Sequence, residues 1–165
     1  MVIVSNPDRD RHMLLTDADY RYQADFRYAL SRFLHVSADN ARTAGVTPQQ
    51  HLLLLAVRGH PSYPAVTIGE VAEYLQVRHH SASLLIERAI RRGAKPSLLH
   101  RVQDSADRRR ALVSLTPEGE DILERITVAN RAALAIWPQV VAGFPRSPIE
   151  RLESESSGNV EAAWE

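Results

Sequence analysis

The stretch that decides the fold is residues 99–119, LHRVQDSADRRRALVSLTPEG. Its two ends, residues 99–102 and 111–115, have the apolar composition and alternating positions of short β-strands. Between them lies a polar turn with two aspartates and the run Arg108-Arg109-Arg110. We therefore predict a β-hairpin with a positively charged tip, which is the form of a wing that contacts DNA.

Two short helices are predicted directly before this hairpin. Thr67-Ile68-Gly69-Glu70 is a capping box that opens the first helix. The second helix is expected to end near Gly93. It places four apolar residues at positions i, i+3, i+4 and i+7, namely Ala82, Leu85, Ile86 and Ala89. Two short helices joined by a tight turn predict a helix-turn-helix, so the segment as a whole is expected to be a winged helix-turn-helix.

Further helices are predicted on both sides of this segment. Apolar residues recur at helical spacing over residues 17–41, and Thr47-Pro48-Gln49-Gln50 is the start of a helix that stops near Gly59. Thr116-Pro117 opens another helix that reaches about residue 136. The fold class is therefore mainly α with a small β-hairpin wing.

The composition of the 165-residue chain excludes several classes of protein. There is no cysteine, and no apolar run is long enough to span a membrane. The first ten residues lack the apolar region of a secretory signal, so we expect a cytoplasmic protein. The seven histidines include no pair at i, i+4, and neither a glycine-rich phosphate loop nor a nucleophile elbow is present. We therefore predict no metal, no cofactor and no enzymatic activity.

Charge is distributed unevenly, although the formal net charge is zero. Residues 78–110 contain nine basic and three acidic side chains, a net charge of +6, and the rest of the chain carries −6. Such a run can simply be a solvated face. Here it coincides with the predicted winged helix-turn-helix, so we interpret it as charge that faces DNA phosphates.

The hairpin resembles that of the MarR family of winged-helix regulators. The residues that carry the resemblance are Asp104-Ser105-Ala106-Asp107-Arg108-Arg109-Arg110, followed by Val113-Ser114-Leu115-Thr116-Pro117-Glu118-Gly119. Supporting matches are Asp25-Phe26-Arg27, residues 45–50 and His79-His80-Ser81-Ala82, so that the resemblance covers about residues 17–151. It implies a two-fold homodimer that regulates transcription from a pseudo-palindromic DNA operator, acting as a ligand-responsive repressor.

The resemblance also implies a domain organisation. Residues 1–165 form a single MarR-like domain, with the winged helix-turn-helix at about residues 48–115. Residues 13–42 and 117–155 form N- and C-terminal dimerisation helices. The first and last helices have apolar residues on more than one side, which agrees with burial against a partner.

The residues expected to contact DNA lie in two places. The start of the recognition helix offers donors that reach guanine or phosphate oxygens in the major groove: Arg78, His79, His80, Ser81 and Ser83. In the wing, the resemblance assigns Arg109 to the minor groove, and Arg108 and Arg110 are expected at phosphates. The alternative for the two histidines is a solvent-exposed position without a binding role.

A small aromatic ligand is a further partner that the resemblance implies. Its site would lie between the dimer helices and the DNA-binding lobe, where aromatic and histidine side chains are available: Tyr20, Phe26, Tyr28, Phe33, His35 and His51. The alternative is that these residues belong to the core or to the dimer interface.

The chain departs from the family pattern at two positions. Ala94-Lys95-Pro96-Ser97 reads as an insertion of about four residues between the recognition helix and the wing. Arg78 stands where a Ser or Thr helix cap is usual. The insertion and the zero net charge leave open a second function, that of a MarR-fold helical dimer that has lost specific DNA binding and acts through protein or small-molecule contacts.

Overall fold

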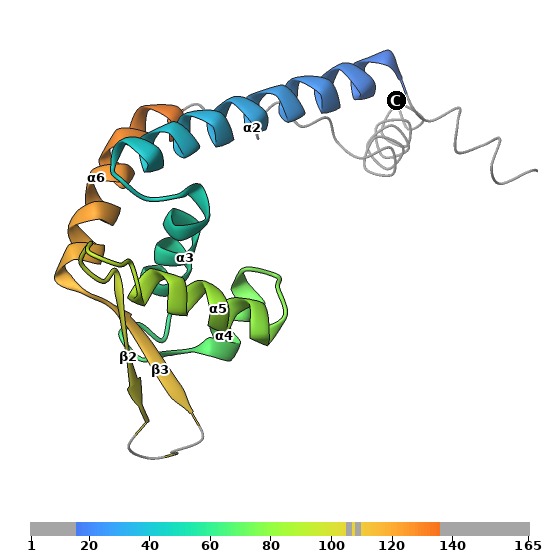
Figure 1. Ribbon diagram of the computed structural model, residues 1–165. Coiled ribbons are helices and arrows are strands. Elements are labelled where there is room, and N and C mark those ends of the chain that lie inside the picture. The colour runs from blue at the N-terminus through green and yellow to red at the C-terminus, as the bar shows by residue number, and fades with distance from the viewer. Residues whose placement is uncertain (1–15, 105–106, 108–109, 136–165) are drawn as a thin grey trace, which may run out of the picture. The chain divides into compact units, whose positions relative to one another are not determined.

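The helices and the hairpin predicted from the sequence are present in the structure (Figure 1). The computed structural model describes residues 16–104, 107 and 110–135. They belong to two units, of which one is formed by residues 34–133 and the other contains residues 16–33, 134 and 135. Within the described residues the fold is mainly helical with one small antiparallel sheet, which confirms the predicted fold class.

Helix α2, Asp17–Thr43, supplies residues to both units. At its start the Thr16 hydroxyl donates to the Asp19 carboxylate at 2.7 Å, and the Thr16 N–H donates to the same oxygen at 2.8 Å. One turn further on, the rings of Tyr22 and Phe26 are stacked with their centroids 6.5 Å apart. These contacts link neighbouring turns at the beginning of the helix.

Helices α3, Pro48–Arg58, and α4, Ile68–Tyr74, both begin with the predicted capping boxes. In α4 the Thr67 hydroxyl accepts from the Glu70 N–H at 3.2 Å, and the Glu70 carboxylate accepts from the Thr67 N–H at 2.7 Å. The bond from the Thr67 N–H to the Glu70 carboxylate, together with one from the Thr67 hydroxyl, holds the pKa of Glu70 below its usual value. Two N–H groups that the first helical turn leaves free are satisfied in this way.

The loop between α3 and α4 is tied to the last helix of the same unit, α6, Pro117–Leu134. The Tyr63 hydroxyl donates to Glu120 at 2.5 Å, and Arg58 Nε donates to the other Glu120 oxygen at 3.2 Å. The Arg58 guanidinium also lies 4.6 Å from the centre of the Tyr63 ring. This cluster fixes the loop that leads into the helix-turn-helix.

Helix α5, His79–Ile90, is the second helix of the helix-turn-helix (Figure 1). It ends three residues before Gly93, which adopts the predicted positive φ, at 66°. The turn between α4 and α5 contains Gln76 with φ 54°, a left-handed conformation that non-glycine residues adopt infrequently. The sequence contains no signal for this conformation.

The sheet has three strands in the order β1, β3, β2. The wing strands β2, Leu99–Gln103, and β3, Ala111–Leu115, pair antiparallel with Leu99 opposite Leu115, as the sequence predicts. The third strand, β1, Val66–Thr67, was not predicted because two residues are too few to show a period. It pairs Val66 with Val113 and thereby joins the start of α4 to the wing.

The core of residues 34–133 lies where the helix-turn-helix, the sheet and α6 meet. Its largest fully buried side chains come from α3, α4, α5, the sheet and α6, and include Leu53, Leu54, Val71, Ile86, Leu98, Leu99, Val113 and Ile126. Leu98 and Leu99 follow the Ala94–Ser97 insertion directly, so the insertion does not displace the wing from the core. No helix within the described residues is both long and apolar enough to cross a membrane.

Candidate DNA-binding surface

Helix α5 buries one face and exposes its beginning. Ala82, Ile86 and Ala89 are fully buried in the core, and Leu85 packs against them, as the apolar spacing predicts. The predicted contact residues at the other side, Arg78, His79, His80 and Ser81, are exposed, whereas Ser83 is half-buried. The structure therefore places four of these five side chains where a duplex can reach them.

Among the described residues, no side chain caps the N-terminus of α5. Arg78 occupies the cap position in an extended conformation, and its side chain makes no capping hydrogen bond. By contrast, α3 and α4 are both closed by threonines. The first-turn N–H groups of α5 are therefore left for an external acceptor, and the helix dipole favours an anion there.

The wing presents arginines close to the tip of the hairpin. Arg101 in β2 and Arg110 before β3 are both exposed. The tip is closed by backbone bonds, since Asp104 N–H donates to Arg110 O at 3.0 Å and Arg110 N–H donates to Asp107 O at 2.9 Å. Arg108 and Arg109 lie outside the described residues.

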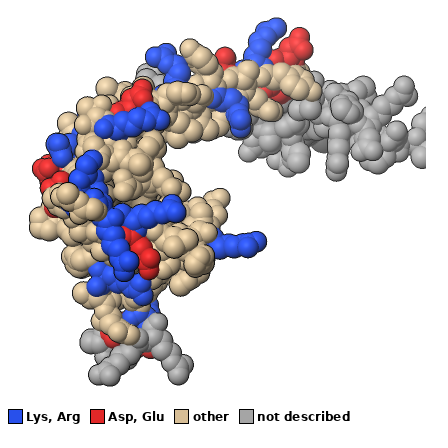
Figure 2. All heavy atoms as spheres, in the orientation of Figure 1, with Lys and Arg blue, Asp and Glu red and all other residues tan. Residues whose placement is uncertain are grey.

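Recognition helix and wing share one cleft of about 290 Å³. It is lined by His79 from α5, by Arg101 and Arg110 from the wing, and by Ile68 and Gly69 at the start of α4. Figure 2 shows Lys and Arg side chains spread over the face that carries α5 and the wing, with acidic side chains in smaller areas between them. The basic hairpin and the histidine-bearing helix end therefore belong to one concave surface.

The position of the wing is fixed at its base by Thr116, the residue that precedes α6. The Thr116 hydroxyl donates to Ser97 O at 2.6 Å and accepts from the Gly119 N–H at 3.1 Å. The Thr116 N–H donates to Leu98 O at 3.1 Å, and the Leu98 N–H donates to Ala89 O at 3.0 Å. The end of α5, the insertion and the start of α6 are thus joined by a continuous set of hydrogen bonds.

Two parts of this surface were not predicted from the sequence, namely Arg101 and the start of α4. Arg101 was counted as part of the basic segment only, because a lone arginine in a strand carries no motif. Its register opposite Val113 places it beside the cleft on the wing. The start of α4 enters the cleft because β1 pairs with β3, and no feature of the sequence indicated that pairing.

The residues considered for ligand binding differ in their surroundings. Tyr20, Tyr28 and His35 are exposed, and Phe26 and Phe33 are half-buried. His51 is buried, its Nδ1 lies 3.5 Å from Ser37 Oγ, and burial lowers its pKa. Beside it Asn130 donates to Ser37 Oγ at 3.2 Å and accepts from Asn40 at 2.8 Å. His51 is therefore part of a buried polar cluster that links α2, α3 and α6.

Comparison with known proteins gives consistent results. The sequence profile described as "MarR family" matches residues 44–110. The HTH-type transcriptional repressor MdtR of Bacillus subtilis (strain 168) is 27% identical over 122 residues, which are 74% of this chain and 72% of MdtR.

Two solved structures show the same fold at low identity. The complex of S. aureus MepR with DNA matches with a TM-score of 0.57 and 19% identity, covering 86% of this chain and 97% of MepR. A mutant of E. coli MarR in complex with operator DNA matches with a TM-score of 0.56 and 17% identity, covering 80% of this chain and 88% of MarR.

The basic cleft between a recognition helix and a wing defines a DNA-binding regulator of the winged helix-turn-helix class. Within that class, the winged helix-turn-helix of this chain is that of the MarR family of transcriptional regulators, whose profile matches residues 44–110. This confirms the resemblance seen in the hairpin.

Proposed function

We propose that this protein is a homodimeric repressor that binds a pseudo-palindromic operator in double-stranded DNA. Each chain inserts the start of α5 into the major groove of one half-site and lays its wing along the adjacent minor groove. The helix contacts are Arg78, His79, His80, Ser81 and Ser83. The wing contacts are Arg108, Arg109 and Arg110, to which we add Arg101.

The cleft shared by His79, Arg101 and Arg110 is the observation that carries this proposal. A duplex reads sequence through the groove edges and is held by its phosphates, so donors from two elements must face it together. The uncapped α5 N-terminus adds N–H groups that suit a phosphate. Because strand side chains alternate, Arg109 is expected in the minor groove when Arg108 and Arg110 meet phosphates.

The name of one relative and the contents of two related structures support the proposal that this protein is a DNA-binding repressor. MdtR is named a transcriptional repressor, and the MepR and MarR structures contain DNA. We infer the same outcome for this chain, namely that its binding to an operator reduces transcription.

The proposal of a homodimer is supported by exposed apolar side chains. On α2 these include Tyr20, Tyr28 and Leu34, which expose 59%, 66% and 55% of their surface. On α6 Val128 exposes 62%. Large apolar side chains at several positions of two long helices are typical of a surface that is covered by a partner.

We further infer that a small aromatic ligand regulates the repressor through Tyr20, Phe26, Phe33, His35 and His51. The buried polar cluster at His51 supports this inference, since it offers hydrogen-bonding groups beside an apolar core. Salicylate serves as a test compound for an aromatic carboxylate. It is expected to lower operator affinity, and His51→Gln is expected to weaken that effect; an identical response of both proteins would contradict the role of His51.

Fluorescence anisotropy with a labelled duplex from the region upstream of the gene tests DNA binding. Arg109→Ala is expected to weaken binding by about 1–3 kcal/mol without changing thermal stability. Arg125→Ala on α6, whose side chain pairs with Asp121 at 3.3 Å, is the matched control and should bind as the wild type does.

A salt series belongs to the same experiment. If several arginines of each chain meet phosphates, the affinity should fall steeply with salt, corresponding to roughly 6–10 released counterions. Wild-type protein that shows no binding at low salt would overturn the proposed function in favour of a dimer that has lost DNA recognition.

A further inference from the structure

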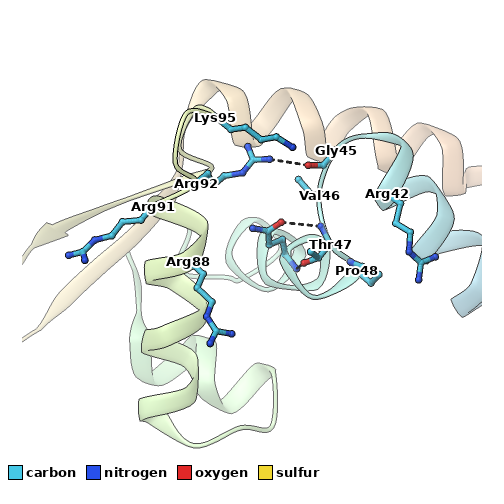
Figure 3. Close-up of a pocket in the computed structure, with 10 residues that line it drawn as sticks. Arg42, Gly45, Val46, Thr47, Pro48, Arg88, Arg91, Arg92 and Lys95 are labelled. Carbon is cyan, nitrogen blue, oxygen red and sulfur yellow. Dashed lines mark hydrogen bonds between the residues drawn. The ribbon is translucent and has the colours of Figure 1, made fainter.

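A second and larger basic cleft lies at the other end of the recognition helix, with a volume of about 660 Å³ (Figure 3). It is formed by the end of α2, the loop into α3, and the end of α5 with the loop that follows it. Its charged lining residues are all basic: Arg42, Arg88, Arg91, Arg92 and Lys95. Within the part of the chain that the structure describes, no acidic side chain lines it.

Three of these five cations line the cleft without an acidic partner among the described residues. Arg42 is paired with Asp39 at 2.7 Å, and Arg91 extends to the side opposite Gly45 in Figure 3. Arg92 and Lys95 extend toward Gly45, whereas Arg88 lies alongside α5, one turn before Arg92. Among the residues that the structure describes, Arg88, Arg92 and Lys95 form no ion pair. Their charges are therefore available to an anion.

Arg92 is held in place before any ligand arrives. Its Nη1 donates to Pro96 O at 3.0 Å, and its Nη2 donates to Gly45 O at 3.1 Å. Both acceptors are neutral carbonyls, so the guanidinium keeps its charge, and three of its five N–H groups remain for a ligand. A fixed donor loses less conformational entropy on binding than a mobile one.

The insertion between the recognition helix and the wing builds part of this cleft. It supplies both Lys95 and the Pro96 carbonyl that orients Arg92. This gives a second physical role to the Ala94–Ser97 segment, which holds the base of the wing but does not line the cleft between recognition helix and wing.

The cleft is also remote from the end of α5 that is proposed to read DNA. Arg88 lies nine positions after His79, and an α-helix rises about 1.5 Å per residue, so the two are roughly 14 Å apart along the axis. His79 lines the first cleft and Arg88 lines the second. The positive charge of residues 78–110 therefore serves two separate surfaces.

We propose that the second cleft binds a compact anion that carries two or more phosphate groups. Arginine forks match phosphate oxygens in pairs, and several cations around one cavity fit several anionic groups. The apolar lining is limited to Val46, which is buried, and Pro48, so the ligand has little apolar surface. This chemistry differs from that of the aromatic effector inferred above.

Isothermal titration calorimetry without DNA tests the site, with inorganic tripolyphosphate as the probe and constant ionic strength. Tripolyphosphate should bind once per chain and more tightly than orthophosphate. Arg88→Gln and Lys95→Gln should each weaken it by about tenfold, because each removes one charge-assisted contact. Arg125→Gln on α6, whose side chain does not line the cleft, is the matched control, and Arg110→Gln is the control on the wing; both should bind tripolyphosphate as the wild type does.

Two results would overturn the site. One is equal weakening by Arg125→Gln or Arg110→Gln, which would show that general positive charge attracts the anion. The other is absence of tripolyphosphate binding while Arg88→Gln and Lys95→Gln reduce operator affinity, which would assign these cations to the DNA surface. Since the calorimetry contains no DNA, its outcome is independent of whether the protein proves to be a repressor.

Discussion

Gly119 illustrates what one residue decides in this molecule. It lies in the first turn of α6, and a Cβ atom at this position would be 2.1 Å from Leu98 O and 3.1 Å from Leu98 C. Both are backbone atoms at the base of the wing, which cannot move without disturbing the bonds of Thr116 to Ser97 and Leu98. The glycine that ends the family-like segment Val113–Gly119 is therefore required by a close approach of two backbone segments.

We predict that Gly119→Ala lowers the free energy of unfolding by about 1–3 kcal/mol, the usual cost of overpacking. Urea denaturation measures this change. Gly69→Ala is the control, since a Cβ there meets only Thr67 Oγ1 at an ordinary 3.8 Å. If Gly119→Ala proves as stable as Gly69→Ala, the backbone at the base of the wing shifts to accommodate the added Cβ atom, and the prediction is wrong.

His51 gives a second prediction for a single residue. Burial lowers its pKa below the usual value of 6.5, so the folded protein takes up this proton at lower pH than the unfolded chain. The contribution of neutral His51 to stability is therefore present above pH 6.5 and is lost as the pH falls through the lower, folded-state pKa.

Stability should thus decline below about pH 6.5, and less steeply in His51→Gln than in the wild type. Denaturant titrations at several pH values measure the two slopes. His80→Gln, at an exposed position, is the control and should follow the wild type. Identical slopes for His51→Gln and the wild type would contradict the assignment.

At the scale of elements, the N-terminus of α5 is accessible to a ligand but lacks a stabilising cap. Its neighbours α3 and α4 are closed by capping boxes, whereas its own N-terminus, with Arg78 as the cap residue, is not closed by a side chain. We predict that Arg78→Ser adds a cap and raises the free energy of unfolding by roughly 0.5–2 kcal/mol. The same variant should weaken operator binding. The serine hydroxyl would accept from the first-turn N–H groups that a phosphate would otherwise use, and the positive charge of Arg78 would be lost.

Chemical denaturation and anisotropy on the same preparation measure both effects. Thr67→Ala at the start of α4 is the opposite case, with an expected loss of about 1 kcal/mol in stability. Arg78→Ser protein that gains no stability would mean that water already satisfies the first turn of α5 adequately.

At the scale of the whole molecule, we predict a dimer with twice the 18.5 kDa mass of one chain. Sedimentation equilibrium measures this mass. Leu34→Glu should weaken the dimer, since it places charge on an exposed apolar position of α2, and should reduce operator affinity together with it. Arg32→Glu, also exposed on α2, is the comparison for the charge alone. A monomeric wild type would contradict the two-fold mode of DNA binding.

The local elements of this protein could be read from its sequence because their signals are local. Both capping boxes, the apolar face of α5 and the strands 99–103 and 111–115 depend on residues a few positions apart. The hairpin motif was specific enough to indicate the family. The end of α5 near Gly93 was also indicated locally, and the helix ends at Ile90 with Gly93 at positive φ.

By itself, the sequence determined the winged helix-turn-helix and the positive charge of residues 78–110, since both follow from spacing along the chain. Only the tertiary structure decided that β1 pairs with β3, that Arg101 joins His79 at one cleft, and that Arg88, Arg92 and Lys95 face another. The physical reason is that charges interact according to their distance in space and not according to their separation along the chain. Residues as far apart in the chain as Gly45 and Arg92 become neighbours only when the core is packed.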